Sequence, residues 1–252
     1  MNILATNDDG IRCDGITCLV EELRARGHYV LTVVPDRDRS GSSHSITFDT
    51  SLPLARIGGD VYTYGGTPVD CVLAALVSGG LGFKADVVVS GINAGPNLGT
   101  DILYSGTAAA ARQGSLYGIP SVAFSIDGSP PYCFAESARW SAAHLDALLR
   151  YWRKGTFINV NYPNSGTYSG CVFAYPAVRI YQDSIKIKKN ADGIESYSLN
   201  DSGVAVQQGE RHAAGVSDWD AVQSNKVSVS IVYSYPKTAE MTEEGNYGGI
   251  VY

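Results

Sequence analysis

The sequence predicts an α/β fold in which helices cover a mostly parallel sheet. Up to about residue 160, short apolar runs alternate with segments of helical periodicity, the pattern typical of βαβ units. Long loops rich in Asp, Asn, Ser and Gly follow several of the apolar runs. After Asn161 the chain changes to short alternating segments rich in Tyr, Val, Ile and Thr, which indicate hairpins. We therefore expect an α/β core followed by a β-rich C-terminal extension.

The individual elements follow from the same patterns. Strands are expected where apolar runs have strand length, at residues 3–6, 29–34, 61–64, 86–90, 121–125 and 157–161. Helices are expected between them, at residues 15–26, 68–78, 106–113 and 135–152. The second helix has the clearest start signal, because Thr67 can act as N-cap, Pro68 fits the first helical position and Asp70 completes a capping box.

The C-terminal part has a different organisation. Residues 178–187 and 227–233 alternate as exposed strands do, and we expect hairpins or β-ribbons there rather than another βαβ unit. No disordered linker separates the two parts, so we expect one domain over residues 1–252, with a core over roughly 1–165 and an extension over roughly 166–252. Such a projecting extension is a natural contact between copies of the chain.

Composition narrows the class of function. The 252 residues carry a formal net charge of −6, and their only basic cluster, residues 186–189, indicates an exposed strand face, so no nucleic-acid polymer is expected as partner. The five cysteines form no C-x-x-C pair, which fits a reducing compartment. No apolar stretch approaches the roughly 20 residues needed to span a bilayer, and the N-terminus lacks signal-peptide features. We expect a soluble cytoplasmic protein without a membrane partner.

Three polar loops are expected to meet at one edge of the sheet. Residues 7–10 follow the first strand, residues 35–45 the second, and residues 91–101 the strand that ends at Ser90. Ligands of open parallel sheets bind at the carboxyl ends of the strands. These loops offer carboxylate, hydroxyl and amide oxygens with no Cys and little His, which indicates a hard metal ion, Mg²⁺, Mn²⁺ or Ca²⁺.

The adjacent carboxylates of Asp8 and Asp9 have two interpretations. Like charges at the end of a buried strand repel each other, and a metal ion, a proton or water must offset them. Alternatively, Asn7 and Gly10 only form a turn, and Asp9 caps the following helix.

Two further features have a functional and an ordinary interpretation. The turn at Ser105 opens a helix of small residues, whose free N–H groups would attract a phosphate, yet Ser105 is equally suited as a plain N-cap. His44 is the only histidine in a candidate loop, where it can serve acid–base chemistry or simply form hydrogen bonds. The chain has no P-loop, dinucleotide-binding or nucleophilic-serine motif.

Taken together, the motifs resemble those of the SurE family, the survival-protein E nucleotidases. The resemblance covers the N-terminal half almost continuously and in family order, through the stretches ILATNDDGI (3–11), VPDRDRSG (34–41), HSIT (44–47), GTPVDCV (66–72), VSGINAGPNLG (89–99) and LYSGTA (103–108). It implies a Rossmann-like three-layer sandwich that forms dimers or tetramers through an exchanged C-terminal segment. Some relatives carry an Asp and a His where residues 231–239 of this chain have neither.

The resemblance also implies an activity and a set of site residues. The activity is metal-dependent hydrolysis of nucleoside 5′-monophosphates, and in some relatives of 3′-monophosphates, with one Mg²⁺ or Mn²⁺ ion as cofactor and Ca²⁺ as a further occupant. The implied metal ligands are Asp8, Asp9, Ser40 and Asn93. The implied phosphate-binding residues are Asn97, Ser105, Gly106 and Thr107.

A mechanism follows from these assignments. The metal ion would lower the pKa of a water molecule that attacks phosphorus, with Asp8 or Asp9 orienting or deprotonating the water and His44 protonating the departing oxygen. An aspartate acting as nucleophile is the variant mechanism. A nucleotide-binding module that does not turn over is the alternative function.

Overall fold

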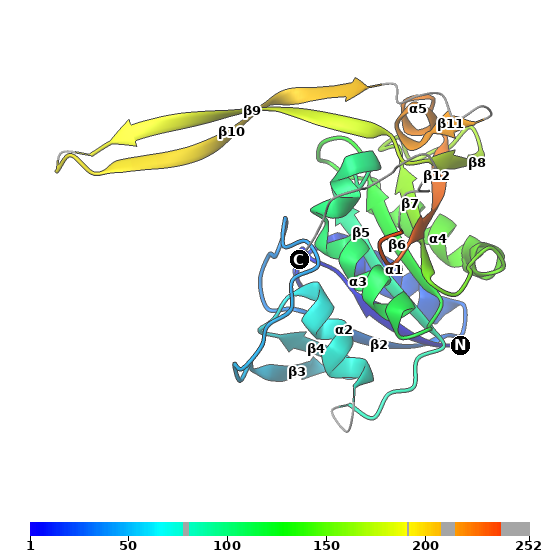
Figure 1. Ribbon diagram of the computed structural model, residues 1–252. Coiled ribbons are helices and arrows are strands. Elements are labelled where there is room, and N and C mark those ends of the chain that lie inside the picture. Colours follow the sequence, from blue (N-terminus) through cyan, green and yellow to red (C-terminus); the bar gives the residue numbers. More distant parts are fainter. Residues whose placement is uncertain (78–80, 191, 208–214, 238–252) are drawn as a thin grey trace, which may run out of the picture.

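The computed structural model describes residues 1–77, 81–190, 192–207 and 215–237. In this part of the chain a ten-stranded, mostly parallel sheet runs through the body (Figure 1). Its strands lie side by side in the order β11 (Val216–Ser217), β8 (Cys171–Tyr175), β12 (Val227–Tyr233), β7 (Thr156–Tyr162), β6 (Ser121–Ile126), β5 (Val87–Ala94), β1 (Asn2–Thr6), β2 (Tyr29–Pro35), β4 (Val61–Tyr64) and β3 (Leu54–Gly58). The predicted α/β class is confirmed.

Helices cover both faces of this sheet. Alternate residues of β1 show the division, because Ile3 belongs to an apolar cluster with α1 (Asp14–Ala25) and α4 (Phe134–Leu149), and Leu4 to a cluster with α2 (Pro68–Leu76) and α3 (Gly106–Leu116). Side chains of a strand point alternately to the two faces, so the central residues of β1, Ile3 to Ala5, must be apolar on both faces. The result is a three-layer sandwich with β1 and β5 at its centre.

The four predicted helices are all present, with ends that differ by a few residues from the expected ones. The start of α2 is as predicted: the Thr67 hydroxyl accepts from the Asp70 amide at 3.2 Å, and the Asp70 carboxylate accepts from the Thr67 amide at 2.9 Å. The predicted last residue of this helix, Ser78, lies outside the described residues. None of the described helices is both long enough and apolar enough to cross a membrane.

The expectation for residues 227–233 is wrong. These residues form β12, which enters the main sheet and pairs antiparallel with β7 and parallel with β8, instead of forming a hairpin outside it. Val227 and Val229 are buried on one face, and Ser228 and Ser230 are also buried, so this strand is covered on both sides at its start. Alternation in sequence indicates a strand but does not identify its partner. Residues after 165 therefore complete the sheet as well as extending from it.

The remaining elements were not predicted. They are strands β3, β8 and β11, the short helix α5 (Asp218–Gln223) and the 3₁₀ helix η1 (Gly99–Leu103), which occupies the end of the third polar loop.

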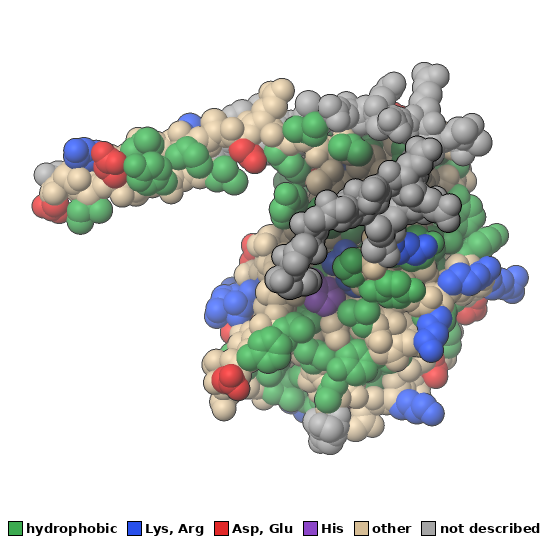
Figure 2. Space-filling view, viewed as in Figure 1, with side chains coloured by type: hydrophobic (Ala, Val, Ile, Leu, Met, Phe, Trp, Pro, Cys, Tyr) green, Lys and Arg blue, Asp and Glu red, His purple; other side chains and the backbone are tan. Residues whose placement is uncertain are grey.

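A two-stranded ribbon projects from the body (Figure 1). It consists of β9 (Val178–Lys189) and β10 (Glu195–Gln207), paired antiparallel, and includes the ribbon predicted over residues 178–187. Ile185 lies opposite Leu199 and Ile187 opposite Tyr197, so these four apolar side chains share one face, and each is more than half exposed. Figure 2 shows hydrophobic side chains gathered along this ribbon.

Candidate functional site

The three polar loops meet at the carboxyl ends of the central strands, as expected for an open parallel sheet. They border a cleft of about 380 Å³. The side chains and backbone that line it belong to Asp8, Ser40, Gly41, Asn93, Ala94, Pro96, Asn97, Asp101, Tyr104, Ser105, Arg179 and Tyr181. Five of the predicted site residues, Asp8, Ser40, Asn93, Asn97 and Ser105, are therefore brought together in one cavity.

Asp8 is the buried carboxylate of the site, with 3% of its surface exposed. It lies just after the end of β1, so the buried strand and the turn that follows it place this carboxylate at the edge of the sheet. Its Oδ2 accepts from the Thr107 amide at 3.2 Å, and its Oδ1 accepts from the Thr107 hydroxyl. Burial, with a smaller contribution from the neighbouring Asp9, raises the pKa of Asp8 to about 6, although the Thr107 hydrogen bonds lower it. A cation beside this carboxylate would offset the cost of its buried charge.

Asp9 is less buried than Asp8 and is not among the residues that line the cleft. Its Oδ2 accepts from the Ala94 amide at 3.3 Å and from the Cys13 thiol at 3.4 Å. Burial raises its pKa, which those two hydrogen bonds counteract. Asp9 does not cap the following helix, because α1 begins at Asp14 with Cys13 at its N-cap and has no side-chain cap.

The turn interpretation of residues 7–10 is nevertheless correct in part. Asn7 closes the turn: its side-chain amide donates to the Gly10 carbonyl at 2.9 Å, and its Oδ1 accepts from the Gly10 amide at 3.2 Å. Gly10 has φ +83°, a conformation that favours glycine. Turn formation and the pairing of two carboxylates are thus compatible, since Asn7 and Gly10 build the turn that presents Asp8 and Asp9.

Ser40 and Asn93 reach the cleft from the second and third loops. The Ser40 hydroxyl donates to Asp38 Oδ1 at 2.6 Å, which leaves its oxygen lone pairs as ligands. The Asn93 side-chain NH₂ donates to the Gly95 carbonyl at 2.9 Å. This bond occupies the amide nitrogen, which is therefore not the atom that would bind a metal ion. The amide oxygen of Asn93 is then the group available to a cation.

The Ser105 turn serves the fold before any ligand. Ser105 is the N-cap of α3, because its hydroxyl accepts from the Ala108 amide at 2.9 Å. Gly106 is required by packing: a Cβ at this position would lie 2.9 Å from Asp8 Cβ and 3.0 Å from Pro68 Cγ. Thr107 directs both its donors to Asp8. Neither Gly106 nor Thr107 lines the cleft.

Asn97 is held in a buried polar network. Its side-chain NH₂ donates to the Ser125 hydroxyl at 2.7 Å, and its backbone carbonyl accepts from the side chains of Asn159 at 2.8 Å and Asn161 at 3.1 Å. These contacts fix the loop after β5 to the ends of β6 and β7. Asn97 lines the cleft as an immobilised amide, a suitable arrangement for a group that must stay in place.

His44 lies outside the set of cleft-lining residues. Its Nε2 is 2.8 Å from the Gln113 Oε1 on α3, and its Nδ1 is buried without a hydrogen-bond partner among the described residues. Burial lowers the pKa of His44, which the bond to Gln113 opposes. A neutral ring that donates through Nε2 fits this environment.

Asp101, Arg179 and Tyr181 line the cleft, and sequence reasoning missed all three. Asp101 comes from η1, while Arg179 and Tyr181 come from the start of β9, the root of the ribbon. The Arg179 guanidinium and the Tyr181 hydroxyl both bind the Asp101 carboxylate. The one signal in the sequence was a lone arginine in an otherwise apolar alternating segment.

The donor chemistry fits a hard divalent ion. The described residues contain no cluster of three or more His, Cys, Asp or Glu side chains that could hold a metal ion. The groups available are the carboxylates of Asp8 and Asp9 and the side-chain oxygens of Ser40 and Asn93. The Ser42 hydroxyl, beside Gly106 and Asp8, is buried without a partner among the described residues. Two adjacent carboxylates of raised pKa, the buried Asp8 and the partly buried Asp9, are the observation that most favours a cation here.

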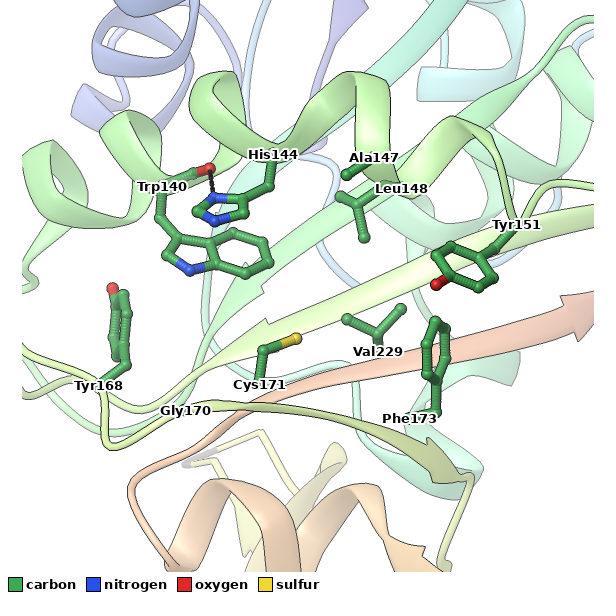
Figure 3. A pocket seen from close by; sticks show the side chains of 10 residues that line it. All are labelled: Trp140, His144, Ala147, Leu148, Tyr151, Tyr168, Gly170, Cys171, Phe173 and Val229. Atoms are coloured by element: carbon green, nitrogen blue, oxygen red, sulfur yellow. Dashed lines mark hydrogen bonds between the residues drawn. The ribbon is translucent and has the colours of Figure 1, made fainter.

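A second cavity, of about 420 Å³, lies between α4 and strands β8 and β12 (Figure 3). It is largely aromatic: the His144 ring stacks on the Trp140 indole with 4.2 Å between ring centroids, and Tyr151 packs against Phe173 edge to face. The close-up shows no carboxylate among the side chains that line it. It contains none of the predicted site residues.

Comparisons with known proteins agree with this architecture. Residues 3–183 match the model of the family described as "Survival protein SurE". A 5′-nucleotidase SurE of Xylella fastidiosa (strain M12) is 43% identical over 173 residues, 65% of this chain and 64% of the relative. A 5′-nucleotidase SurE of Stenotrophomonas maltophilia (strain K279a) is 37% identical over 236 residues, 91% of this chain and 88% of the relative.

The comparison of folds points to the same family. The crystal structure of the SurE protein from Aquifex aeolicus superposes with a TM-score of 0.78 at 35% identity and covers 94% of this chain and 95% of its own. The aligned part of the chain spans less than two thirds of the Xylella relative but most of the Stenotrophomonas and Aquifex proteins. The family match over residues 3–183 includes all the sequence motifs and most strands of the sheet, and the chain belongs to the SurE family.

Proposed function

We propose that the protein is a metal-dependent phosphomonoesterase that hydrolyses nucleoside 5′-monophosphates, with 3′-monophosphates as a second class of substrate. The observation that carries the proposal is the buried Asp8 carboxylate, adjacent to Asp9 and opening with Ser40 and Asn93 onto one cleft. Family relatives named 5′-nucleotidase SurE support the same substrate class. One Mg²⁺ or Mn²⁺ ion is the proposed cofactor, with Ca²⁺ able to occupy the same oxygen ligands.

The metal ligands would be Asp8, Asp9, Ser40 and Asn93. When bound, the ion supplies charge neutralisation for a phosphate oxygen and a lowered pKa for an attacking water molecule. The protein's part is to hold these ligands in place: Thr107 restrains Asp8, the Ala94 amide restrains Asp9, and the Gly95 carbonyl orients Asn93. Such restraint keeps the electrostatic environment ready for the developing charge.

Water is the nucleophile we favour. Both oxygens of Asp8 already accept hydrogen bonds from Thr107, and a carboxylate so engaged is a poor nucleophile. Asp9 keeps its Oδ2 on the Ala94 amide, so its other oxygen would orient or deprotonate the water. Solvent ¹⁸O appearing in the released phosphate, without a trapped phosphoenzyme, is the expected result; a covalent aspartyl-phosphate would show attack by the protein instead.

The phosphate-binding part would be built from Asn97 and the turn formed by Ser105, Gly106 and Thr107. Asn97 and Ser105 line the cleft, whereas Gly106 allows the turn to approach Asp8 closely. His44 is our candidate for protonating the departing ribose oxygen. For this role, the bound substrate must place its leaving oxygen near the His44 ring, which is hydrogen-bonded to Gln113 in the structure.

The chain would act as a dimer or tetramer assembled through its C-terminal part. Support comes from the ribbon, whose apolar face of Ile185, Ile187, Tyr197 and Leu199 is exposed in a single copy. Exposed apolar surface of this kind typically marks a contact between proteins.

The activity is tested by phosphate release from AMP, GMP, 3′-AMP and an aryl phosphate, with Mg²⁺ or Mn²⁺ and with chelator. Asp8→Asn should abolish release, and Asp146→Asn, an exposed carboxylate on α4 and outside the three predicted site loops, is the matched control. Release that survives both chelator and Asp8→Asn would refute the metal-centred mechanism. Nucleotide binding without release from any substrate would support the alternative, a nucleotide-binding module on the same fold.

A further inference from the structure

One wall of the cleft comes from the root of the ribbon and not from the three predicted loops. Arg179 and Tyr181 of β9 line the cleft there, opposite the loop that carries Asp101. The side chains of Arg179 and Asp101 are 7% and 9% exposed, and they form an ion pair. The Tyr181 hydroxyl donates to the other carboxylate oxygen of Asp101. Both oxygens of Asp101 are therefore engaged by residues of the ribbon.

Arg179 is itself held from several sides. Its guanidinium lies over the Trp219 indole, 5.0 Å from the ring centroid, and its backbone amide donates to the Thr100 hydroxyl at 2.9 Å. Asp218 ties η1 to the residues just before β9, because its carboxylate accepts from the amides of Gly99 at 2.7 Å and Ala177 at 2.8 Å. The root of the ribbon and η1 thus form one rigid wall.

The charges of this wall matter for an anionic ligand. Asp8 and Asp101 line the cleft and Asp9 is the neighbour of Asp8, so a metal ion held by Asp8 and Asp9 would leave the Asp101 carboxylate without a counter-charge from the ion. A phosphate monoester is a dianion near neutral pH, so an uncompensated Asp101 lining the same cleft would repel it. Arg179 supplies the positive charge that offsets Asp101, because Asp101 is not one of the proposed metal ligands.

Asp101 also organises the phosphate side of the cleft. Its backbone carbonyl accepts from the Tyr104 amide at 3.0 Å and from the Ser105 amide at 3.1 Å, immediately before α3 begins. Displacement of Asp101 would therefore move the Ser105 turn. The ion pair with Arg179 and the hydrogen bond from Tyr181 together fix the side chain of this residue.

We propose that Arg179 is a positioning residue that makes the cleft receptive to a phosphate dianion by neutralising the charge of Asp101. The inference rests on the proposed function, since it assigns a determinant of substrate charge to the same cleft. Arg179 acts through Asp101 and needs no contact with the substrate. It also makes the root of the ribbon a part of the site.

The test is a double-mutant cycle on KM and kcat with AMP in saturating Mn²⁺. Arg179→Met should raise KM at least tenfold and change kcat less than threefold, because ground-state attraction is lost and the reacting groups stay. Asp101→Asn should change KM less than threefold. The double variant Arg179→Met/Asp101→Asn should return KM to within threefold of the wild type, since it removes both charges. Lys186→Met, an exposed cation farther along the ribbon, is the control and should leave KM unchanged.

A purely structural role predicts a different result. The double variant would then be as impaired as Arg179→Met or worse, and kcat would fall with KM; either outcome, or an unchanged KM in Arg179→Met, overturns the proposal. Removing one partner of a buried ion pair can prevent folding. If Arg179→Met does not fold, Arg179→Lys and the double variant carry the test, with KM near the wild-type value expected in both and a tenfold rise in either counting against the proposal.

Failure of the proposed function is distinguished by a binding measurement. Calorimetric titration of the Mn²⁺-loaded protein with inorganic phosphate should show at least tenfold weaker binding in Arg179→Met, with recovery in the double variant, whether or not AMP is hydrolysed. A wild type that binds phosphate but hydrolyses nothing refutes only the enzymatic function. A wild type that hydrolyses AMP and an Arg179→Met variant that binds phosphate equally well refute only the role of Arg179.

Discussion

The Thr107 hydroxyl and the Thr107 backbone amide both donate hydrogen bonds to the Asp8 carboxylate, although the two residues are 99 positions apart in the chain. This contact joins the end of β1 to the first turn of α3. It gives the buried carboxylate partners in its ionised form, which is the form that binds a cation.

Removal of the Thr107 hydroxyl should weaken metal binding. Thr107→Val keeps the shape and the backbone donor but loses the hydroxyl that holds Asp8 Oδ1. Loss of a contact that orients a metal ligand typically costs 10–100-fold in affinity, and we expect a loss of that order for Mn²⁺. Isothermal titration with Mn²⁺ measures it. Thr107→Ser keeps the hydroxyl and should bind within a few-fold of the wild type; equal losses in both variants would contradict the assigned role.

The stability of the metal-free protein should fall as the pH rises from 4 to 7. Burial raises the pKa of Asp8 from 3.8 to about 6, so the folded state holds the proton more tightly than the unfolded state. The stabilising contribution is fully present below the unfolded pKa and is lost as the pH rises through the folded pKa. A difference between 3.8 and about 6 corresponds to at most about 3 kcal/mol. Urea unfolding in chelator across this range measures it.

The control for that experiment is Asp8→Asn, which cannot titrate at this position. Other groups, such as Asp9 and His44, contribute to the pH dependence of both proteins, so the difference between the two curves isolates Asp8. Saturating Mn²⁺ should reverse the trend in the wild type alone, because metal and proton compete for the carboxylate. Parallel curves for wild type and variant would refute the raised pKa.

A methyl group at Gly106 should disturb the site. The added Cβ of Gly106→Ala would lie 2.9 Å from Asp8 Cβ and 2.8 Å from the Ser42 hydroxyl, closer than carbon atoms pack. We expect a loss of about 1–3 kcal/mol in stability and a larger proportional loss of activity, because Asp8 is the group displaced. Thermal unfolding and phosphate release measure the two effects. Gly58→Ala, where the added Cβ meets nothing within 4 Å, should change neither.

If His44 protonates the leaving group, the effect of replacing His44 on kcat should depend on which leaving group the substrate carries. His44→Asn should lower kcat for AMP by about 10²-fold and change kcat for p-nitrophenyl phosphate less than threefold, because nitrophenolate leaves without a proton. Since burial holds the pKa of His44 below 6.5, kcat for AMP should decrease as the pH rises through that lowered pKa. Equal losses with both substrates would assign His44 a structural role on Gln113 instead.

Disruption of the apolar ribbon face should reduce the oligomer. Ile185→Glu combined with Leu199→Lys places opposite charges at a directly paired position, so the ribbon keeps a favourable cross-strand contact while its apolar face is lost. Sedimentation velocity should show a smaller assembly than the wild type. Lys186→Gln, one residue along on the other face of the ribbon, should sediment as the wild type does. An unchanged mass in the paired variant would exclude the ribbon as a contact.

Much of the fold followed from local patterns. Apolar runs of strand length such as residues 3–6 and 121–125 predicted buried strands, which the structure confirms, and the four residues from Thr67 to Asp70 predicted a capping box, which it also confirms. The polar loops after the strands at residues 3–6, 29–34 and 86–90 also predicted one shared cleft, because parallel strands end at the same edge of a sheet. Apolar periodicity, capping and loop chemistry involve near neighbours, and for that reason the sequence by itself determined them.

Contacts between distant segments were decided by the tertiary structure alone. The alternation in residues 227–233 predicted a hairpin or ribbon, and only packing placed these residues beside β7. The bonds of Thr107 to Asp8 and of Arg179 to Asp101 join segments 99 and 78 residues apart. No periodicity encodes such pairs, because burial energy depends on how whole layers fit and not on the order of neighbouring residues. The sequence determined which loops form the site, and the folded chain determined what each carboxylate in it is bound to.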